Sequence, residues 1–188
     1  MFSHKYQTGK LAKSTTAIAA ASILCAAAAH ASDVAAPKMV LTAYINGAGG
    51  ESVMTGKYDV ALAEIKMDRS GGSDAYTAKI TNQCVAYAAM KQLTQAMSAC
   101  DEALRSAKFE RISSQRYATG SRIQNSYVAI AYTNRAVVHI LAKDPEGAKS
   151  DMARAKSLAP DAEFVSKTLL AMETSASKIA QLSVTPAR

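Results

Sequence analysis

The chain has 188 residues, a formal net charge of +7, few aromatic residues and no tryptophan. This length suggests one domain, and the absence of a basic stripe interleaved with aromatic residues argues against nucleic-acid binding. Three cysteines and three histidines provide few ligands for a metal, so we expect neither a metal nor a cofactor.

Residues 1–31 are typical of a secretory signal peptide. Three lysines and no acidic residue precede an apolar run over about 17–29, which ends in a small-x-small signature at Ala31. The alternative, a membrane anchor, needs roughly 20 apolar residues, and this run is shorter. We therefore expect cleavage after Ala31 and export to the periplasm or beyond. Loss of the signal lowers the net charge to about +4.

An internal repeat follows. Shifting residues 78–108 by 52 positions places them on 130–160, where eight of 31 positions are identical. Apolar residues recur at helical spacing in both copies, so each copy predicts two helices joined by a short turn. In the second copy Asp144 is suited to cap a helix and Pro145 to be its first residue. Pro160 then ends that helix.

These residues resemble the tetratricopeptide repeat (TPR) family, whose unit is a helix–turn–helix with small residues where its helices touch. The second copy carries the family's pattern at Tyr132, Ala136, His139, Ala148, Met152, Ala155 and Pro160. The first copy departs from it, with Ile80 in place of the large aromatic residue and Lys108 in place of the proline. The resemblance implies an all-α fold, a short stack of TPR-like antiparallel helical hairpins.

The predicted organisation is about two and a half repeats with a C-terminal capping helix. We expect an irregular N-terminal segment over 32–52, a TPR-like helical domain over 53–182 and a frayed tail over 183–188. The partial repeat lies upstream of the first full copy, and the capping helix covers about 162–182. A polar loop after an extended helix end separates the two full copies, around 108–125.

Cys84 and Cys100 are predicted to lie on the inward faces of two antiparallel helices in one hairpin. Export would place them where thiols oxidise, and a disulfide would staple the hairpin. The alternative is a pair of unbonded, buried thiols, since a mismatch of register would separate the Cα atoms by more than about 7 Å. A redox-active pair is disfavoured because the C-x-x-C spacing is absent.

Asn82 and Asn134 occupy equivalent positions of the repeat. The resemblance implies that they face a concave groove in which an asparagine amide binds the backbone of an extended peptide, with Val85 and Val137 on the same apolar face. The alternative is that the chain covers this face itself, through residues 33–52 or its C-terminal helix.

No catalytic motif is present, so we predict a protein that is not an enzyme: an exported scaffold or adaptor that binds a protein or peptide. The sequence identifies neither that partner nor the oligomeric state. An alternative is a cell-envelope structural protein that contacts anionic lipid or cell-wall polymer through the basic 108–122 loop, which carries Lys108, Arg111, Arg116 and Arg122.

Overall fold

The computed structural model describes residues 38–115, 121–175 and 182–187. These residues form helices almost throughout, which confirms the predicted all-α class, with one short strand pair in addition. In chain order the elements are β1 (Met39–Ala43), α1 (Gly50–Met54), α2 (Tyr58–Met67), α3 (Ser73–Ala89), α4 (Leu93–Gln115), α5 (Ser121–Leu141), α6 (Pro145–Leu158), α7 (Glu163–Ser175) and β2 (Leu182–Pro186).

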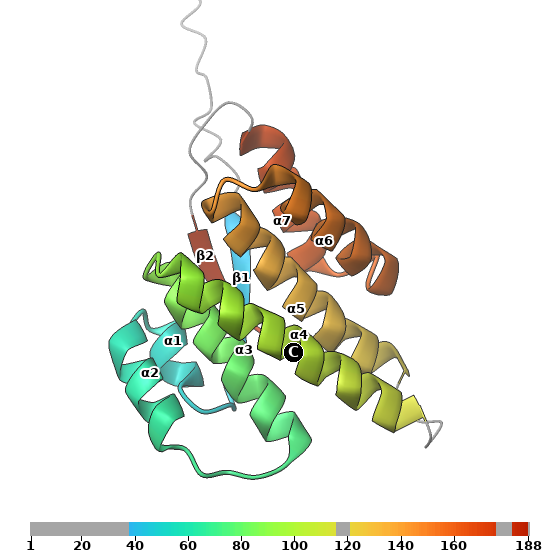
Figure 1. Ribbon diagram of the computed structural model, residues 1–188. Coiled ribbons are helices and arrows are strands. Elements are labelled where there is room, and N and C mark those ends of the chain that lie inside the picture. The colour runs from blue at the N-terminus through green and yellow to red at the C-terminus, as the bar shows by residue number, and fades with distance from the viewer. Residues whose placement is uncertain (1–37, 116–120, 176–181, 188) are drawn as a thin grey trace, which may run out of the picture. The chain divides into compact units, whose positions relative to one another are not determined.

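Two helical hairpins, α3–α4 and α5–α6, lie side by side, and α4 packs against α5 (Figure 1). The turns of the two hairpins share one backbone conformation, because Lys91 and Lys143 have positive φ angles of 59° and 62°. In the second hairpin the Asp144 side chain accepts a hydrogen bond from the Gly147 amide at 2.9 Å, and Pro145 begins α6. The internal repeat is thus a repeat of local structure as well as of sequence.

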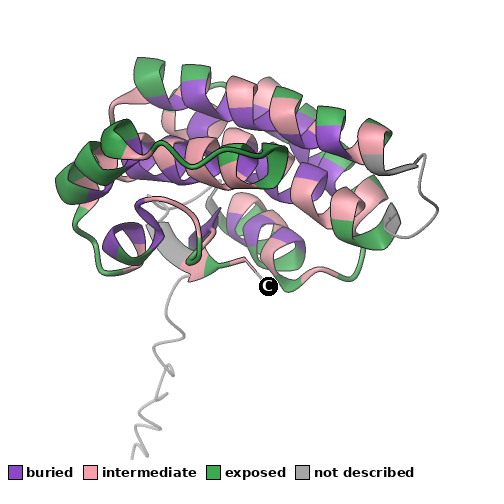
Figure 2. Ribbon diagram, turned by 90° about the horizontal axis from the view of Figure 1, so that it is seen from below, coloured by how far each residue is buried: buried purple, intermediate pink, exposed green. Residues whose placement is uncertain are grey.

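Small residues allow the helices to approach closely. Ala96, Ala136 and Ala148 are fully buried, and a larger side chain at any of them would force helix axes apart. Figure 2 shows the buried residues on the helix sides that face one another and the exposed residues on the outer sides (Figure 2). This is the amphipathic arrangement expected of packed helices.

The strands β1 and β2 are parallel, with Leu41 opposite Val184, and they correct two predictions. The segment 32–52, expected to be irregular, contains β1, and the tail 183–188, expected to be frayed, contributes most of β2. Every residue of β1 is buried, and the strand packs against α3, α5 and α7. Hydrogen bonds between the strands order both segments, and burial in the helical stack also holds β1.

A glycine-rich turn leads from β1 into α1. A Cβ atom at Gly50 would lie 2.2 Å from the carbonyl oxygen of Tyr44, and Gly49 has a φ angle of 72°. Only glycine fits such a close approach and such a backbone conformation. These glycines prevent a long first helix in the partial repeat, whose described part is the short α1 followed by α2.

The boundaries of three predicted segments change. Helix α4 continues to Gln115 and α5 begins at Ser121, so the basic residues expected in a loop at Lys108, Arg111 and Arg122 are helical; Arg116 and the signal segment 1–31 lie outside the described residues. The capping helix α7 ends at Ser175, whereas the prediction extended it to Leu182, which instead begins β2.

Candidate functional site

The face predicted to line a groove is covered by the chain's own strand β1, and Asn134 binds that strand. The Thr42 amide donates to Oδ1 of Asn134 at 2.8 Å, and Nδ2 of Asn134 donates to the Thr42 carbonyl oxygen at 2.8 Å. Asn134 is fully buried. One asparagine amide therefore satisfies both backbone groups of one strand residue, as its paired donor and acceptor allow.

Asn82, the equivalent residue of the first copy, makes the same pair of bonds to Tyr44. The Tyr44 amide donates to Oδ1 of Asn82 at 2.7 Å, and Nδ2 donates to the Tyr44 carbonyl oxygen at 2.9 Å. The same Nδ2 also donates to the carbonyl oxygen of Ala48 at 3.0 Å, in the glycine-rich turn. Equivalent residues of the two copies thus bind backbone groups two positions apart, one at Thr42 within β1 and one at Tyr44 directly after it.

This spacing follows from strand geometry. In an extended strand, the backbone groups of alternate residues point to the same side, so the Thr42 and Tyr44 groups both face the helices. The groups of Ala43 face the other side, where its carbonyl oxygen accepts a hydrogen bond from the Ala187 amide at 2.6 Å. Strand β1 therefore pairs with asparagine side chains along one edge and with β2 along the other.

Apolar packing holds β1 in place as well. Val85 and Val137, predicted to line the groove, are fully buried in one cluster with Met39 and Leu41 of β1. The four predicted groove residues come together as the repeat implies, and the chain fills the groove with its own segment 39–43. Internal covering, the alternative left open by the sequence, is the arrangement in the structure.

Cys84 of α3 and Cys100 of α4 form a disulfide, with their Cα atoms 4.9 Å apart. The separation is within the range found for disulfides, so the mismatch of register does not occur. Cys84 belongs to the same buried cluster as Val85 and Leu41. The bond therefore fixes the helix pair that supplies Asn82 to the groove.

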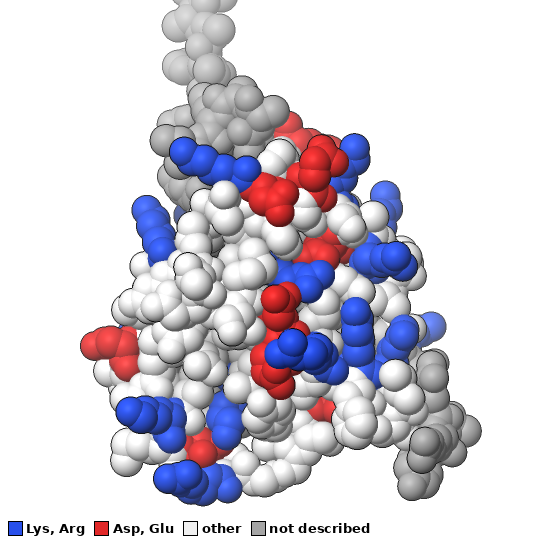
Figure 3. Space-filling model, in the orientation of Figure 1, with Lys and Arg blue, Asp and Glu red and all other residues white. Residues whose placement is uncertain are grey.

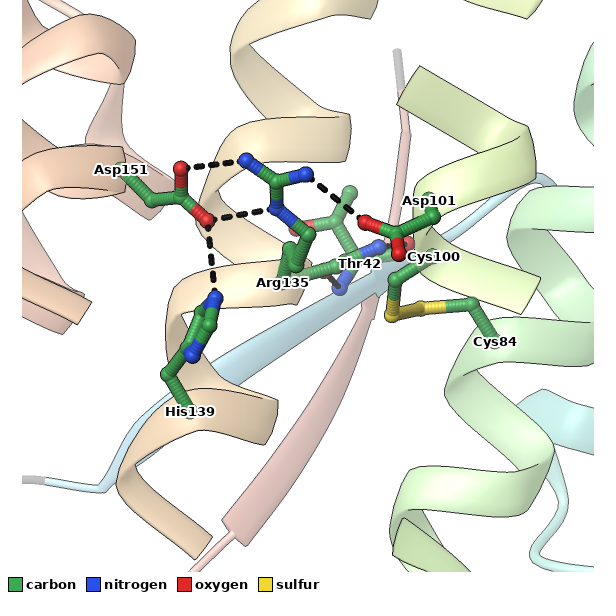
Figure 4. The surroundings of a disulfide bond; sticks show 8 residues. Thr42, Cys84, Cys100, Asp101, Arg135, His139 and Asp151 are labelled. Carbon is green, nitrogen blue, oxygen red and sulfur yellow. Dashed lines mark hydrogen bonds and ion pairs between the residues drawn. A yellow bond between two sulfur atoms is a disulfide. The ribbon is translucent and has the colours of Figure 1, made fainter. Parts of the chain in front are cut away.

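An ion-pair network ties the second hairpin to the first. Arg135 of α5 donates two hydrogen bonds to Asp151 of α6 and one to Asp101 of α4, all at 2.7 Å. These bonds, chiefly those to Asp151, raise the pKa of the Arg135 guanidinium above its ordinary value. Figure 4 shows Arg135 between the two aspartates, with His139 of the same helix approaching Asp151 as well (Figure 4). The adjacent residue, Asn134, is thereby held on a helix braced from both sides.

His139 lies between two carboxylates. Its Nδ1 is 2.7 Å from Oδ2 of Asp144, the residue that caps α6, and its Nε2 is 3.7 Å from Oδ2 of Asp151. The contacts join the end of α5 to α6, which agrees with a packing role. Among the described residues, no cluster of three or more histidine, cysteine or acidic side chains is arranged to hold a metal ion.

Two of the basic residues considered for an envelope surface, Lys108 and Arg111, have partners on the helices. Nζ of Lys108 lies 5.0 Å from the centroid of the Tyr132 ring, and Nη1 of Arg111 donates to Oδ1 of Asn125 at 3.5 Å. On the face seen in Figure 3, basic and acidic side chains are interspersed (Figure 3). The structure does not gather Lys108, Arg111 and Arg122 into a basic loop.

Neither strand was predicted, although the sequence carries signals for both. Residues 39–44 are rich in apolar and β-branched types and are bounded by Pro37 and by Asn46-Gly47, a pattern typical of a short strand before a turn. Residues 182–186 carry a weaker alternation that ends in a proline, as an edge strand can.

Comparisons with known proteins identify no relative. No family model matches the chain, and neither the curated proteins nor the solved structures contain a significant match. In the part of the chain that the structure describes, no helix combines the length and the apolar character needed to cross a membrane.

Proposed function

We propose that the protein is an exported, non-enzymatic, TPR-like scaffold or adaptor that binds an extended segment of a partner protein. The observation that carries the proposal is the outer edge of β1: the buried Asn82 and Asn134 hold the β1 segment from the helix side, and its other edge pairs through the backbone with an extended segment. Such contacts recognise an extended backbone, the usual basis of peptide recognition by strand addition. The groove is therefore built around a strand.

The partner segment takes the position of β2 in this proposal, rather than that of β1. Strand β1 is buried along its whole length and supplies core residues, so its removal would unfold the groove. The main contacts of β2 are with β1 and α1. Replacement of β2 by a partner segment would break the backbone hydrogen bonds along the outer edge of β1 and leave the asparagine contacts of β1 intact.

Unfilled space beside β2 supports the same choice. A cavity of about 370 Å³ and another of about 410 Å³ both reach the end of the strand, and Ala187 lines both of them. A partner segment with larger side chains could fill this space. Strand β2 therefore leaves space beside its end that a partner segment could fill.

The test uses the full chain with β2 weakened in place. By the alternation of a strand, the Thr185 amide faces β1, as the Ala187 amide does, whereas the Val184 amide faces away. Thr185→Pro removes a pairing donor, and Val184→Pro is the matched control because it removes an unpaired one. A fluorescent peptide with the sequence of residues 181–187 should bind the Thr185→Pro variant more tightly than the wild type or the control, measured by anisotropy.

Peptide binding to none of the three proteins would contradict the proposal. If the peptide does bind, natural partners are sought by capture from the envelope fraction with the Thr185→Pro variant. A relevant partner is one that excess peptide displaces and that the Val184→Pro protein retains poorly. Substitution of the asparagines is unsuitable for this purpose, because it would damage the fold of the groove itself.

A further inference from the structure

The cavity of about 370 Å³ at the end of β2 has an unusual lining. It is bounded by the turn after β1, the start of α3, and residues from α4 and α5. The lining residues that matter here are Tyr44, Asp74, Thr77, Glu110, Tyr127 and Ala187. The volume is enough to admit a long side chain, as small ligand sites of this size do.

The charges of the lining are all negative. Asp74 and Glu110 contribute carboxyl groups, and no lysine, arginine or histidine is among the lining residues. Glu110 is only 4% exposed, and the Thr77 hydroxyl donates a hydrogen bond to it. Burial raises the pKa of Glu110 above its ordinary value, opposed by the Thr77 hydrogen bond and increased by the charge of Asp74. None of the described lining residues is a cation that could pair with Glu110, and a bound cation would stabilise such a buried carboxyl.

A second observation is independent of these acids. The Tyr44 hydroxyl is excluded from solvent and has no hydrogen-bond partner among the described residues. The Tyr44 ring packs edge-on against Tyr127, with centroids 5.6 Å apart. Burial raises the pKa of the Tyr44 hydroxyl, with contributions from Tyr127 and Glu110, so it stays neutral and can accept a hydrogen bond. Aromatic walls, an unsatisfied oxygen and two carboxyl groups together suit a guanidinium or ammonium group.

The position of the cavity connects it to the groove. The Ala187 amide pairs with the Ala43 carbonyl oxygen at 2.6 Å, and the same residue lines the cavity. A segment that replaces β2 would therefore place its residue equivalent to Ala187 at the cavity. We propose that this cavity binds the cationic side chain of an arginine or lysine that directly follows the pairing strand of the partner segment. This inference rests on the proposed function and names the kind of segment that fits it.

The experiment compares two peptides on the full-length Thr185→Pro protein. Both have the sequence of residues 181–187 with an amidated end; one carries Ala187→Arg and the other Ala187→Gln. We expect the arginine peptide to bind about tenfold more tightly at low salt, a typical effect of charge-assisted hydrogen bonds. Glu110→Gln or Asp74→Asn in the protein should remove that advantage, whereas Glu102→Gln, an acid outside the cavity, should leave it unchanged.

The outcomes separate the two proposals. Equal binding of the two peptides would overturn the cation site and leave strand addition standing, because both peptides still pair with β1. An arginine advantage that survives both Glu110→Gln and Asp74→Asn would also overturn it, since the charge would then be recognised elsewhere. Binding of neither peptide would remove the proposed function and this inference with it.

Discussion

Replacement of Asn134 by alanine tests whether the asparagine contacts hold the fold. The substitution removes two buried hydrogen bonds of 2.8 Å and leaves the Thr42 amide and carbonyl without their partner. An unsatisfied buried backbone group costs about 1–3 kcal/mol, so we expect the free energy of unfolding to fall by about 3 kcal/mol. For a domain of this size, that corresponds to a decrease in Tm of about 6–12 °C.

The assay is urea unfolding of the oxidised protein followed by circular dichroism, with Asn46→Ala as the matched control. Asn46 is exposed in the turn after β1, and its substitution should change stability by less than about 0.5 kcal/mol. If Asn134→Ala is as mild as Asn46→Ala, the two hydrogen bonds contribute nothing to stability, and the groove cannot be regarded as organised around β1.

Three further changes probe the elements around the groove. Reduction of the Cys84–Cys100 disulfide should lower the free energy of unfolding by about 3 kcal/mol, as expected for a loop of this length. Intact mass before and after alkylation reports whether the thiols are free, and two free thiols in the native protein would contradict the bond. Arg135→Met leaves the buried Asp151 uncompensated and should cost about 3 kcal/mol, most of which the added change Asp151→Leu should recover in the double variant. Burial raises the pKa of Glu110 above its ordinary value. Between the ordinary and the raised pKa, the native state holds a proton that the unfolded chain has released, so the free energy of unfolding should fall as pH rises through that interval. Urea unfolding at several pH values should show this decline in the wild type and not in Glu110→Gln.

The helical hairpins could be predicted from the sequence because their determinants are local. Apolar spacing, the cap at Asp144 and the start at Pro145 lie within a few residues of the structure they specify. The groove asparagines could be predicted for a different reason. The repeat placed Asn82 and Asn134 at equivalent positions, and equivalent positions on packed hairpins face the same way.

The strand pair could not be predicted in the same manner. Met39 and Leu182 are partners in the sheet but lie far apart in the sequence. The residues of a five-residue segment do not specify which distant segment it pairs with. The cavity could not be predicted because its walls come from five separate parts of the chain. Glu110 directly follows the exposed Phe109, in a stretch whose sequence predicts a polar helix end and loop.

The two strands differ in how they are held, and this difference is what makes a self-filled groove compatible with binding. A short helical stack leaves an apolar face on its first helices, and β1 covers it with a fully buried strand. This burial stabilises the helical stack and leaves the outer edge of β1 for backbone pairing. The outer edge holds β2 through backbone pairing, which any extended segment can offer. In the proposed exchange, the affinity of a partner for this edge depends on what it adds beyond the backbone. We propose that it adds a cation at the acidic cavity beside Ala187, where β2 has only an alanine side chain.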